Sequence, residues 1–96
     1  MAKIFFDTQL QVSFLKEGRR YVAYAPALDL STSGKTLEEA RKRFGEAAML
    51  FFDELTRRGT LGEVLGELGW QKINRSWKPP MVVSQQSETI KIPVAA

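Results

Sequence analysis

The apolar residues of the first segment of the chain recur at every second position, the period of a strand with one buried face. They are Ile4, Phe6, Leu10, Val12 and Phe14. Residues 16–20 contain Gly18 and predict a hairpin turn, and the aromatic and β-branched run 21–24 predicts a returning strand. Pro26 ends that strand or places it at a sheet edge, because proline has no N–H for a sheet ladder. Residues 28–32 predict a third short strand.

A long amphipathic helix is predicted to begin at Thr36. The hydroxyl of Thr36 can accept from the N–H of Glu39, and the Glu39 side chain can reach back, which is the pattern of a capping box. Apolar residues then fall in one sector at about 100° per residue. They are Leu37, Ala40, Phe44, Ala47, Ala48, Phe51 and Leu55. Gly59 supplies a left-handed stop for this helix.

The remainder of the chain begins with a second predicted capping box, Thr60 and Glu63, which indicates a short helix ending at Gly69. Beyond it, residues 88–94 alternate in polarity, and Pro93 makes this segment a predicted edge strand. The fold class is therefore α+β: an antiparallel sheet of three to four strands with helices packed on one face, in the order β-β-β-α-(α)-β. We assign residues 1–70 to an α+β domain and residues 71–96 to a C-terminal extension, in the same domain or in a dimer interface.

The long helix is apolar beyond one stripe, so one sheet cannot cover all of its apolar side chains. Two interpretations stay open: the second helix and the tryptophan-containing tail cover them, or a second subunit does. An edge strand also invites pairing between chains, which favours a homodimer or a higher homo-oligomer. The residues assigned to this oligomer interface are Met49, Phe52, Trp77, Ile90 and Ile92.

The composition leaves little reactive chemistry in this chain of 96 residues, which contains no histidine and no cysteine. Nucleophilic catalysis needs a base beside its nucleophile, and without histidine the Ser31-Thr32-Ser33 cluster has no obvious base. Paired carboxylates could hold a divalent metal or act in acid–base catalysis, but nothing in the sequence brings Asp7 and Asp29 together. The segment Gly34-Lys35-Thr36 resembles the end of a phosphate-binding loop, but Asp29 stands where that motif has its first glycine. We therefore expect no catalytic site, no metal site, no cofactor and no small-molecule substrate.

The net charge of +3 is spread along the sequence, which is typical of a solvated surface. The longest apolar run, residues 47–52, is far below the roughly 18 residues that a membrane span needs. The first residues lack the apolar core of a signal peptide, so we expect a cytoplasmic protein with no membrane partner. Arg19, Arg20 and the arginines of the long helix leave nucleic-acid binding as an alternative function.

Residues 21–52 resemble the HicB family of bacterial antitoxins, and the resemblance extends over about residues 9–70. The residues that carry it are Tyr21-Val22-Ala23, Pro26, Leu28, Ser31-Thr32, Gly34, Thr36 and Glu38-Glu39-Ala40, followed by the apolar helix. The resemblance implies a partial ribonuclease-H-like fold without catalytic carboxylates. It also implies an oligomeric, non-catalytic member of a toxin–antitoxin system. Such a protein binds and masks a HicA-like toxin, a small mRNA-cleaving ribonuclease of the double-stranded-RNA-binding type.

The family's C-terminal operator-binding segment has no counterpart here, because two prolines and an alternating segment follow Trp70. We therefore do not extend operator DNA binding to this chain. The resemblance does not fix the partner contacts, so we choose them from the predicted strand and turn. They are Tyr24, Pro26, Leu28 and Asp29. The alternative is a nucleic-acid-binding module or an orphan protein-interaction module with a different partner.

Overall fold

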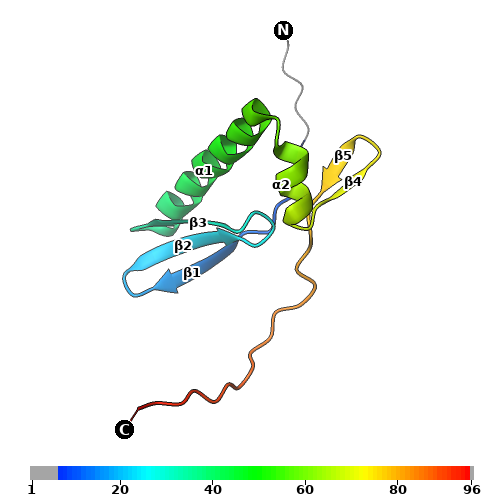
Figure 1. Cartoon of the computed structure of the whole chain (residues 1–96). Helices are drawn as coiled ribbons and strands as arrows, with labels where there is room; N and C mark the ends of the chain where they lie inside the picture. Colours follow the sequence, from blue (N-terminus) through cyan, green and yellow to red (C-terminus); the bar gives the residue numbers. More distant parts are fainter. Residues whose placement is uncertain (1–6, 96) are drawn as a thin grey trace.

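A three-stranded antiparallel sheet lies against one long helix in the computed structural model, which describes residues 7–95 (Figure 1). The strands are β1 (Ser13–Glu17), β2 (Arg20–Ala25) and β3 (Leu30–Gly34), in the spatial order β1-β2-β3. The helices α1 (Leu37–Arg58) and α2 (Leu61–Glu67) follow, and a small second sheet pairs β4 (Gln71–Ile73) with β5 (Ser76–Lys78). The predicted α+β class is confirmed.

The β1–β2 hairpin closes through Gly18, as predicted. Gly18 has a φ of 59°, a left-handed conformation that costs glycine little, and Glu17 pairs with Arg20 across the turn. The strand begins later than the alternation indicates, because Leu10 and Val12 precede β1. Ile4 and Phe6 lie outside the described residues.

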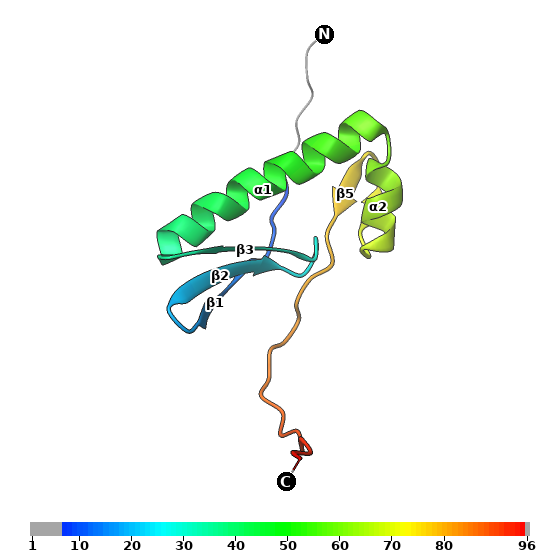
Figure 2. The same cartoon turned by 60° about the vertical axis from the view of Figure 1, so that its left-hand side comes forward.

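One face of the sheet is covered by α1 (Figure 2). Ala23 and Ala25 of β2 are fully buried there, in one cluster with Ala40 and Phe44 of α1. Because strand side chains alternate between faces, Arg20, Val22 and Tyr24 point to the other side. The small alanines allow the helix to approach the sheet closely. Phe44 is the one large side chain buried between the helix and the sheet in this cluster.

A second apolar cluster joins α2 to the end of the sheet. Its buried members are Ala27, Leu28, Leu65 and Trp70. Phe52 of α1 packs against this cluster, with its ring 6.2 Å from the ring of Trp70 in an edge-to-face arrangement. The chain's own second helix and Trp70 thus cover Phe52, whereas Met49 and Leu50 remain exposed.

The ends of α1 follow the predicted capping signals, except that the Glu39 side chain accepts from the N–H of Lys35 and not from that of Thr36. Thr36 Oγ1 accepts from the N–H of Glu39 at 3.0 Å, and Gly59 has a φ of 70°. The second predicted capping box is wrong, because the Thr60 side chain makes no cap hydrogen bond. The N–H of Thr60 instead donates to the carbonyl of Leu55 at the end of α1. That hydrogen bond holds Thr60 at φ −110° and ψ 9°, away from the extended conformation that an N-cap needs.

The C-terminal part of the chain differs most from the prediction. The β4–β5 hairpin was not predicted, and Asn74 adopts a φ of 59° in its turn. The predicted strand over residues 88–94 is wrong: residues 79–95 are extended but pair with no strand in the described chain. A strand requires a hydrogen-bonded neighbour, and this segment runs away from the sheet (Figure 1). No helix within residues 7–95 combines the length and apolarity that crossing a bilayer would require.

Candidate protein-binding surface

The connection between β2 and β3 is a tight turn in which two backbone hydrogen bonds follow one another. The N–H of Leu28 donates to the carbonyl of Ala25, and the N–H of Asp29 donates to the carbonyl of Pro26, each at 3.2 Å. Proline suits the second position of such a turn because its ring fixes φ. Asp29 has a φ of 49°, a left-handed conformation that aspartate tolerates better than most residues. The turn therefore projects Pro26 and Asp29 into solvent.

Tyr24 and Asp29 are joined across this turn. The Tyr24 hydroxyl donates to Asp29 Oδ1 at 3.1 Å. This hydrogen bond, together with partial desolvation and the nearby negative charge, raises the pKa of the Tyr24 phenol. The bond restricts both side chains before any partner arrives, and a preordered pair loses less entropy on binding than two free side chains.

Trp70 stabilises the turn from the buried side. Its indole N–H donates to the carbonyl of Ala27 at 2.8 Å in a buried hydrogen bond. Leu28 is 3% exposed and packs in the same cluster, so its side chain lies beneath the turn and not on the surface. Of the four residues chosen from the sequence, the structure brings Tyr24, Pro26 and Asp29 together on the outside and places Leu28 inside.

The turn borders the face of the sheet that α1 leaves uncovered, which we call the open sheet face. Its members are Ser13, Leu15, Glu17, Arg20, Val22, Tyr24, Ser31 and Ser33. The strand register places Tyr24 between Ser13 and Ser31, and Val22 between Leu15 and Ser33. The face thus mixes hydroxyls, two aliphatic side chains and one acid–arginine pair, Glu17 and Arg20, which suits a protein surface better than a small ligand.

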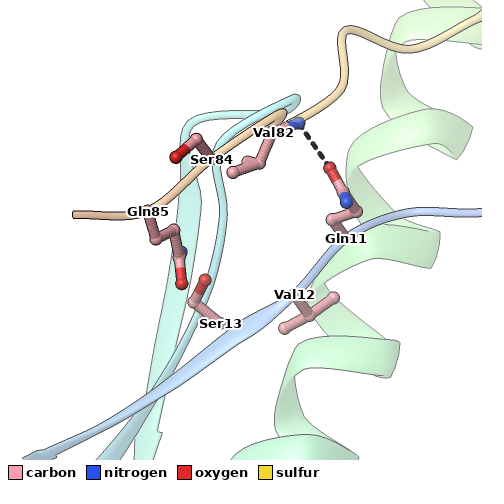
Figure 3. Close-up of a pocket in the computed structure, with 6 residues that line it drawn as sticks. All are labelled: Gln11, Val12, Ser13, Val82, Ser84 and Gln85. Atoms are coloured by element: carbon pink, nitrogen blue, oxygen red, sulfur yellow. Dashed lines mark hydrogen bonds between the residues drawn. The ribbon is translucent and has the colours of Figure 1, made fainter.

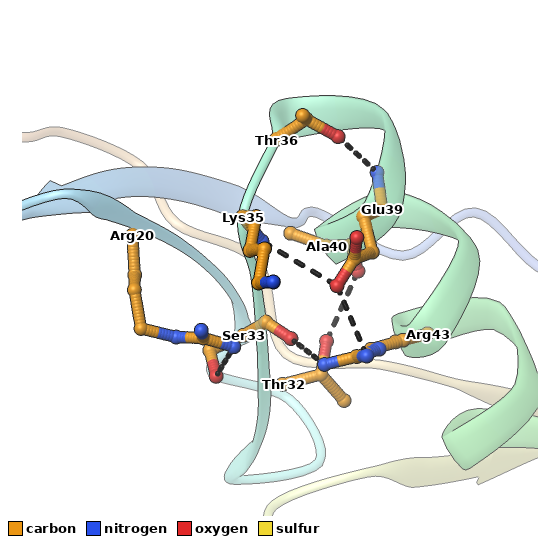
Figure 4. A network of polar contacts seen from close by, with 8 residues as sticks. All are labelled: Arg20, Thr32, Ser33, Lys35, Thr36, Glu39, Ala40 and Arg43. Atoms are coloured by element: carbon orange, nitrogen blue, oxygen red, sulfur yellow. Dashed lines mark hydrogen bonds and ion pairs between the residues drawn. The ribbon is translucent and has the colours of Figure 1, made fainter.

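The segment that resembles a phosphate loop is occupied by contacts within the chain (Figure 4). Thr36 caps α1, and the N–H of Lys35 donates to Glu39 Oε1 at 3.4 Å. Arg43 pairs with Glu39 at 3.0 Å and donates to the carbonyl of Ser33 at 3.0 Å. These groups fasten the end of β3 to the first turns of α1, which is a structural role.

The residues assigned to an oligomer interface do not form one patch. Met49 is exposed on α1, and Phe52 is partly buried in the chain's own second cluster. Trp77 packs partly buried against that cluster, beside Gly62 of α2. Ile90 and Ile92 are exposed in the extended tail, far along the chain from the other three.

Within residues 7–95, no three histidine, cysteine or acidic side chains gather closely enough to hold a metal ion.

Two contacts that organise the surface were not predicted from the sequence: the Tyr24–Asp29 and Trp70–Ala27 hydrogen bonds. The second had a usable signal, because a tryptophan buried in a small domain usually finds an acceptor for its N–H.

The comparisons with known proteins add no family or relative to this description. No family model, curated protein or solved structure matches the chain.

Proposed function

We propose that this chain is a non-catalytic antitoxin-type protein of the cytoplasm, which binds and masks a small mRNA-cleaving ribonuclease of HicA-like type. The observation that carries the proposal is the preordered turn, in which Tyr24 and Asp29 are hydrogen-bonded above a backbone held by Trp70. A masking protein needs a fixed surface that keeps its shape when it meets the toxin.

The chemistry of this surface supports a protein partner with a basic, RNA-binding active site. Asp29 presents an exposed carboxylate, Tyr24 an aromatic ring, and Pro26 a rigid apolar surface. Aromatic side chains are enriched among residues that dominate protein interfaces. A carboxylate opposite basic side chains steers association and excludes partners of the wrong charge. The open sheet face next to the turn would extend the contact area.

Direct nucleic-acid binding receives less support from the placement of the arginines. Four arginines of α1 pair with acids of the same helix, as in Arg57 with Glu54 at 2.8 Å and Arg58 with Glu54 at 2.7 Å. Such pairs lower the charge available to phosphates. Of the arginines named for this alternative, only Arg19 and Arg20 lie outside these ion pairs, so we favour the protein partner.

The proposal is tested by co-expression with the product of the neighbouring gene, which it expects to be a small ribonuclease. We expect relief of growth arrest, and inhibition of mRNA cleavage by the purified chain. The variants Tyr24→Phe and Asp29→Asn remove the phenol hydroxyl and the charge, respectively. Asparagine tolerates the left-handed backbone of position 29, so the turn is retained. Each variant should weaken inhibition by about tenfold or more if the pair is a contact hot spot.

Glu63→Gln serves as the matched control, because Glu63 is an exposed acid of α2 and takes no part in the hydrogen bonds that hold the turn. It should inhibit as well as the natural chain does. Failure of the natural chain to bind the ribonuclease or to relieve arrest would remove the antitoxin proposal. Equal weakening by the control and by Asp29→Asn would show that net charge, and not this turn, determines binding.

A further inference from the structure

The tail of the chain carries apolar side chains that nothing in the described structure covers. It leaves the body after β5 and runs as an extended segment (Figures 1 and 2). Val83, Ile90, Ile92 and Val94 are 94%, 71%, 76% and 88% exposed. The last three lie on one side of the alternating segment 88–94, as in a strand that buries one face. A segment of this pattern is suited to pairing with a sheet.

The start of the tail is fixed beside the start of β1. The N–H of Val82 donates to the side-chain oxygen of Gln11, and Ser84 and Gln85 line an open surface pocket with Ser13 (Figure 3). The tail therefore passes Gln11 before Ser13 and runs in the same direction as β1. This contact determines where the later apolar residues can go.

The tail cannot place its apolar end on its own β1. Strand residues have nearly equal rise, so a tail that continued from Gln85 beside Ser13 would bring Ile90 level with Gly18. At Gly18 the chain has already turned into β2. Residues 90–94 would extend past the hairpin into solvent. The apolar end of the tail thus fits another molecule better than its own.

The outer edge of β1 is the matching acceptor. In the described chain β1 pairs with β2 on one side only, and its residues from Phe14 to Glu17 are exposed. The other edge strand, β3, is partly occupied by α1, since Arg43 donates to the carbonyl of Ser33. Phe14 faces α1 beneath the guanidinium of Arg41, 5.3 Å from its ring, and is 39% exposed. A strand added outside β1 would cover this ring.

We propose that residues 88–94 add as a strand to the β1 edge of a second copy of this chain, and that two copies exchange tails reciprocally. Ile90 and Ile92 then lie on the side of Phe14 and α1, and Lys91 lies on the side of Leu15. Pro93 has no N–H, so its backbone faces away from β1. The added strand therefore has a gap on its outer edge, which opposes further strand addition and favours a closed dimer over a fibre.

Sedimentation of the full chain tests the exchange. The natural chain should sediment at tens of micromolar with twice its 10.9 kDa mass. The double variant I90D/I92D should sediment as a monomer with unchanged secondary structure by circular dichroism. The control S87D/T89D adds the same two charges outside the apolar face and should remain a dimer. A monomeric natural chain, or a dimeric I90D/I92D variant, would overturn the proposal.

A disulfide experiment identifies the strands that meet, and it is unambiguous because the chain has no cysteine of its own. One copy carries Leu15→Cys, and a second copy with a purification tag carries Lys91→Cys. The two are mixed, unfolded, refolded together and oxidised. A disulfide between the tagged and untagged chains is expected. A third variant carries both cysteines in one chain. If it forms only an internal disulfide, and the two singly substituted chains form no disulfide with each other, the tail folds back on its own chain and the exchange is refuted.

Discussion

The indole N–H of Trp70 donates to the carbonyl of Ala27 at 2.8 Å, and the two residues are 43 positions apart. This buried hydrogen bond joins the end of α2 to the turn that carries Tyr24, Pro26 and Asp29. The carbonyl of Ala27 lies in a turn and not in a sheet ladder, so its partner has to come from elsewhere in the fold. Trp70 thus links the stability of the second apolar cluster to the shape of the candidate surface.

Trp70→Phe should destabilise the fold by more than a change of apolar surface alone would. The variant leaves a buried carbonyl without its donor, which costs about 1–3 kcal/mol. Urea denaturation measures the loss. Trp77→Phe is the control, because Trp77 is less buried and its indole N–H makes no hydrogen bond within the described residues. If the two variants lose the same stability, the hydrogen bond to Ala27 does not have the role assigned to it.

Titration of the tyrosines should detect the Tyr24–Asp29 pair. The pKa of Tyr24 is raised in the folded chain, whereas a tyrosine in an unfolded chain has a pKa of about 10. The folded state therefore holds its phenol proton to higher pH than the unfolded state does. The stabilisation is complete below the unfolded pKa and is lost as the pH rises through the folded value.

Ultraviolet absorbance of the phenolate follows this titration, and the chain has only two tyrosines. Tyr24→Phe should remove the late-titrating phenol, and Asp29→Asn should move it to lower pH. A titration curve that Asp29→Asn leaves unchanged would contradict the assigned cause of the shift.

Local signals in the sequence predict the β1–β2 hairpin and the long helix, whereas the third strand, expected over residues 28–32, lies at Leu30–Gly34. The alternation and Gly18 predict the β1–β2 hairpin, and Thr36 and Gly59 mark the two ends of α1. These features depend on residues close together in the chain, where backbone conformation and one or two side chains decide the structure.

The errors arose where distant contacts decide the structure. The backbone of Thr60 is set by the end of α1, so its capping signal has no effect. The exposed turn suggests Leu28 as a contact residue, but its side chain is buried in the cluster around Trp70. Residues 88–94 have the pattern of a strand, but a strand forms only beside a partner strand. For the same reason the sequence could suggest Tyr24 and Asp29 separately but not their hydrogen bond.

Alanine substitutions at two glycines, Gly34 and Gly45, should change the free energy of unfolding in opposite directions. A Cβ at Gly34 would lie 2.7 Å from the backbone nitrogen of Ala40 and 2.9 Å from Cβ of Glu39, closer than atoms can approach. Gly34→Ala should therefore push β3 away from α1 and cost about 1–3 kcal/mol. A Cβ at Gly45 meets nothing within 4 Å, so Gly45→Ala should stabilise α1 by about 1 kcal/mol.

Thermal denaturation distinguishes the two substitutions, since 1 kcal/mol shifts Tm by roughly 4–8 °C in a domain of this size. The melting temperature should fall for the Gly34 variant and rise for the Gly45 variant. A rise for Gly34→Ala would mean that the end of β3 does not lie as close to α1 as the structure places it.

Thr36 and Thr60 each precede a helix and stand three residues before a glutamate, but only the first acts as a cap. Thr36→Ala removes the acceptor for the N–H of Glu39 and should lower the free energy of unfolding by about 1 kcal/mol. Thr60→Ala removes no cap hydrogen bond and should change it by less than about 0.5 kcal/mol. Urea denaturation of both variants under one buffer condition makes the comparison. Equal losses would contradict the structure and would indicate that Thr60 caps α2 as the sequence predicts.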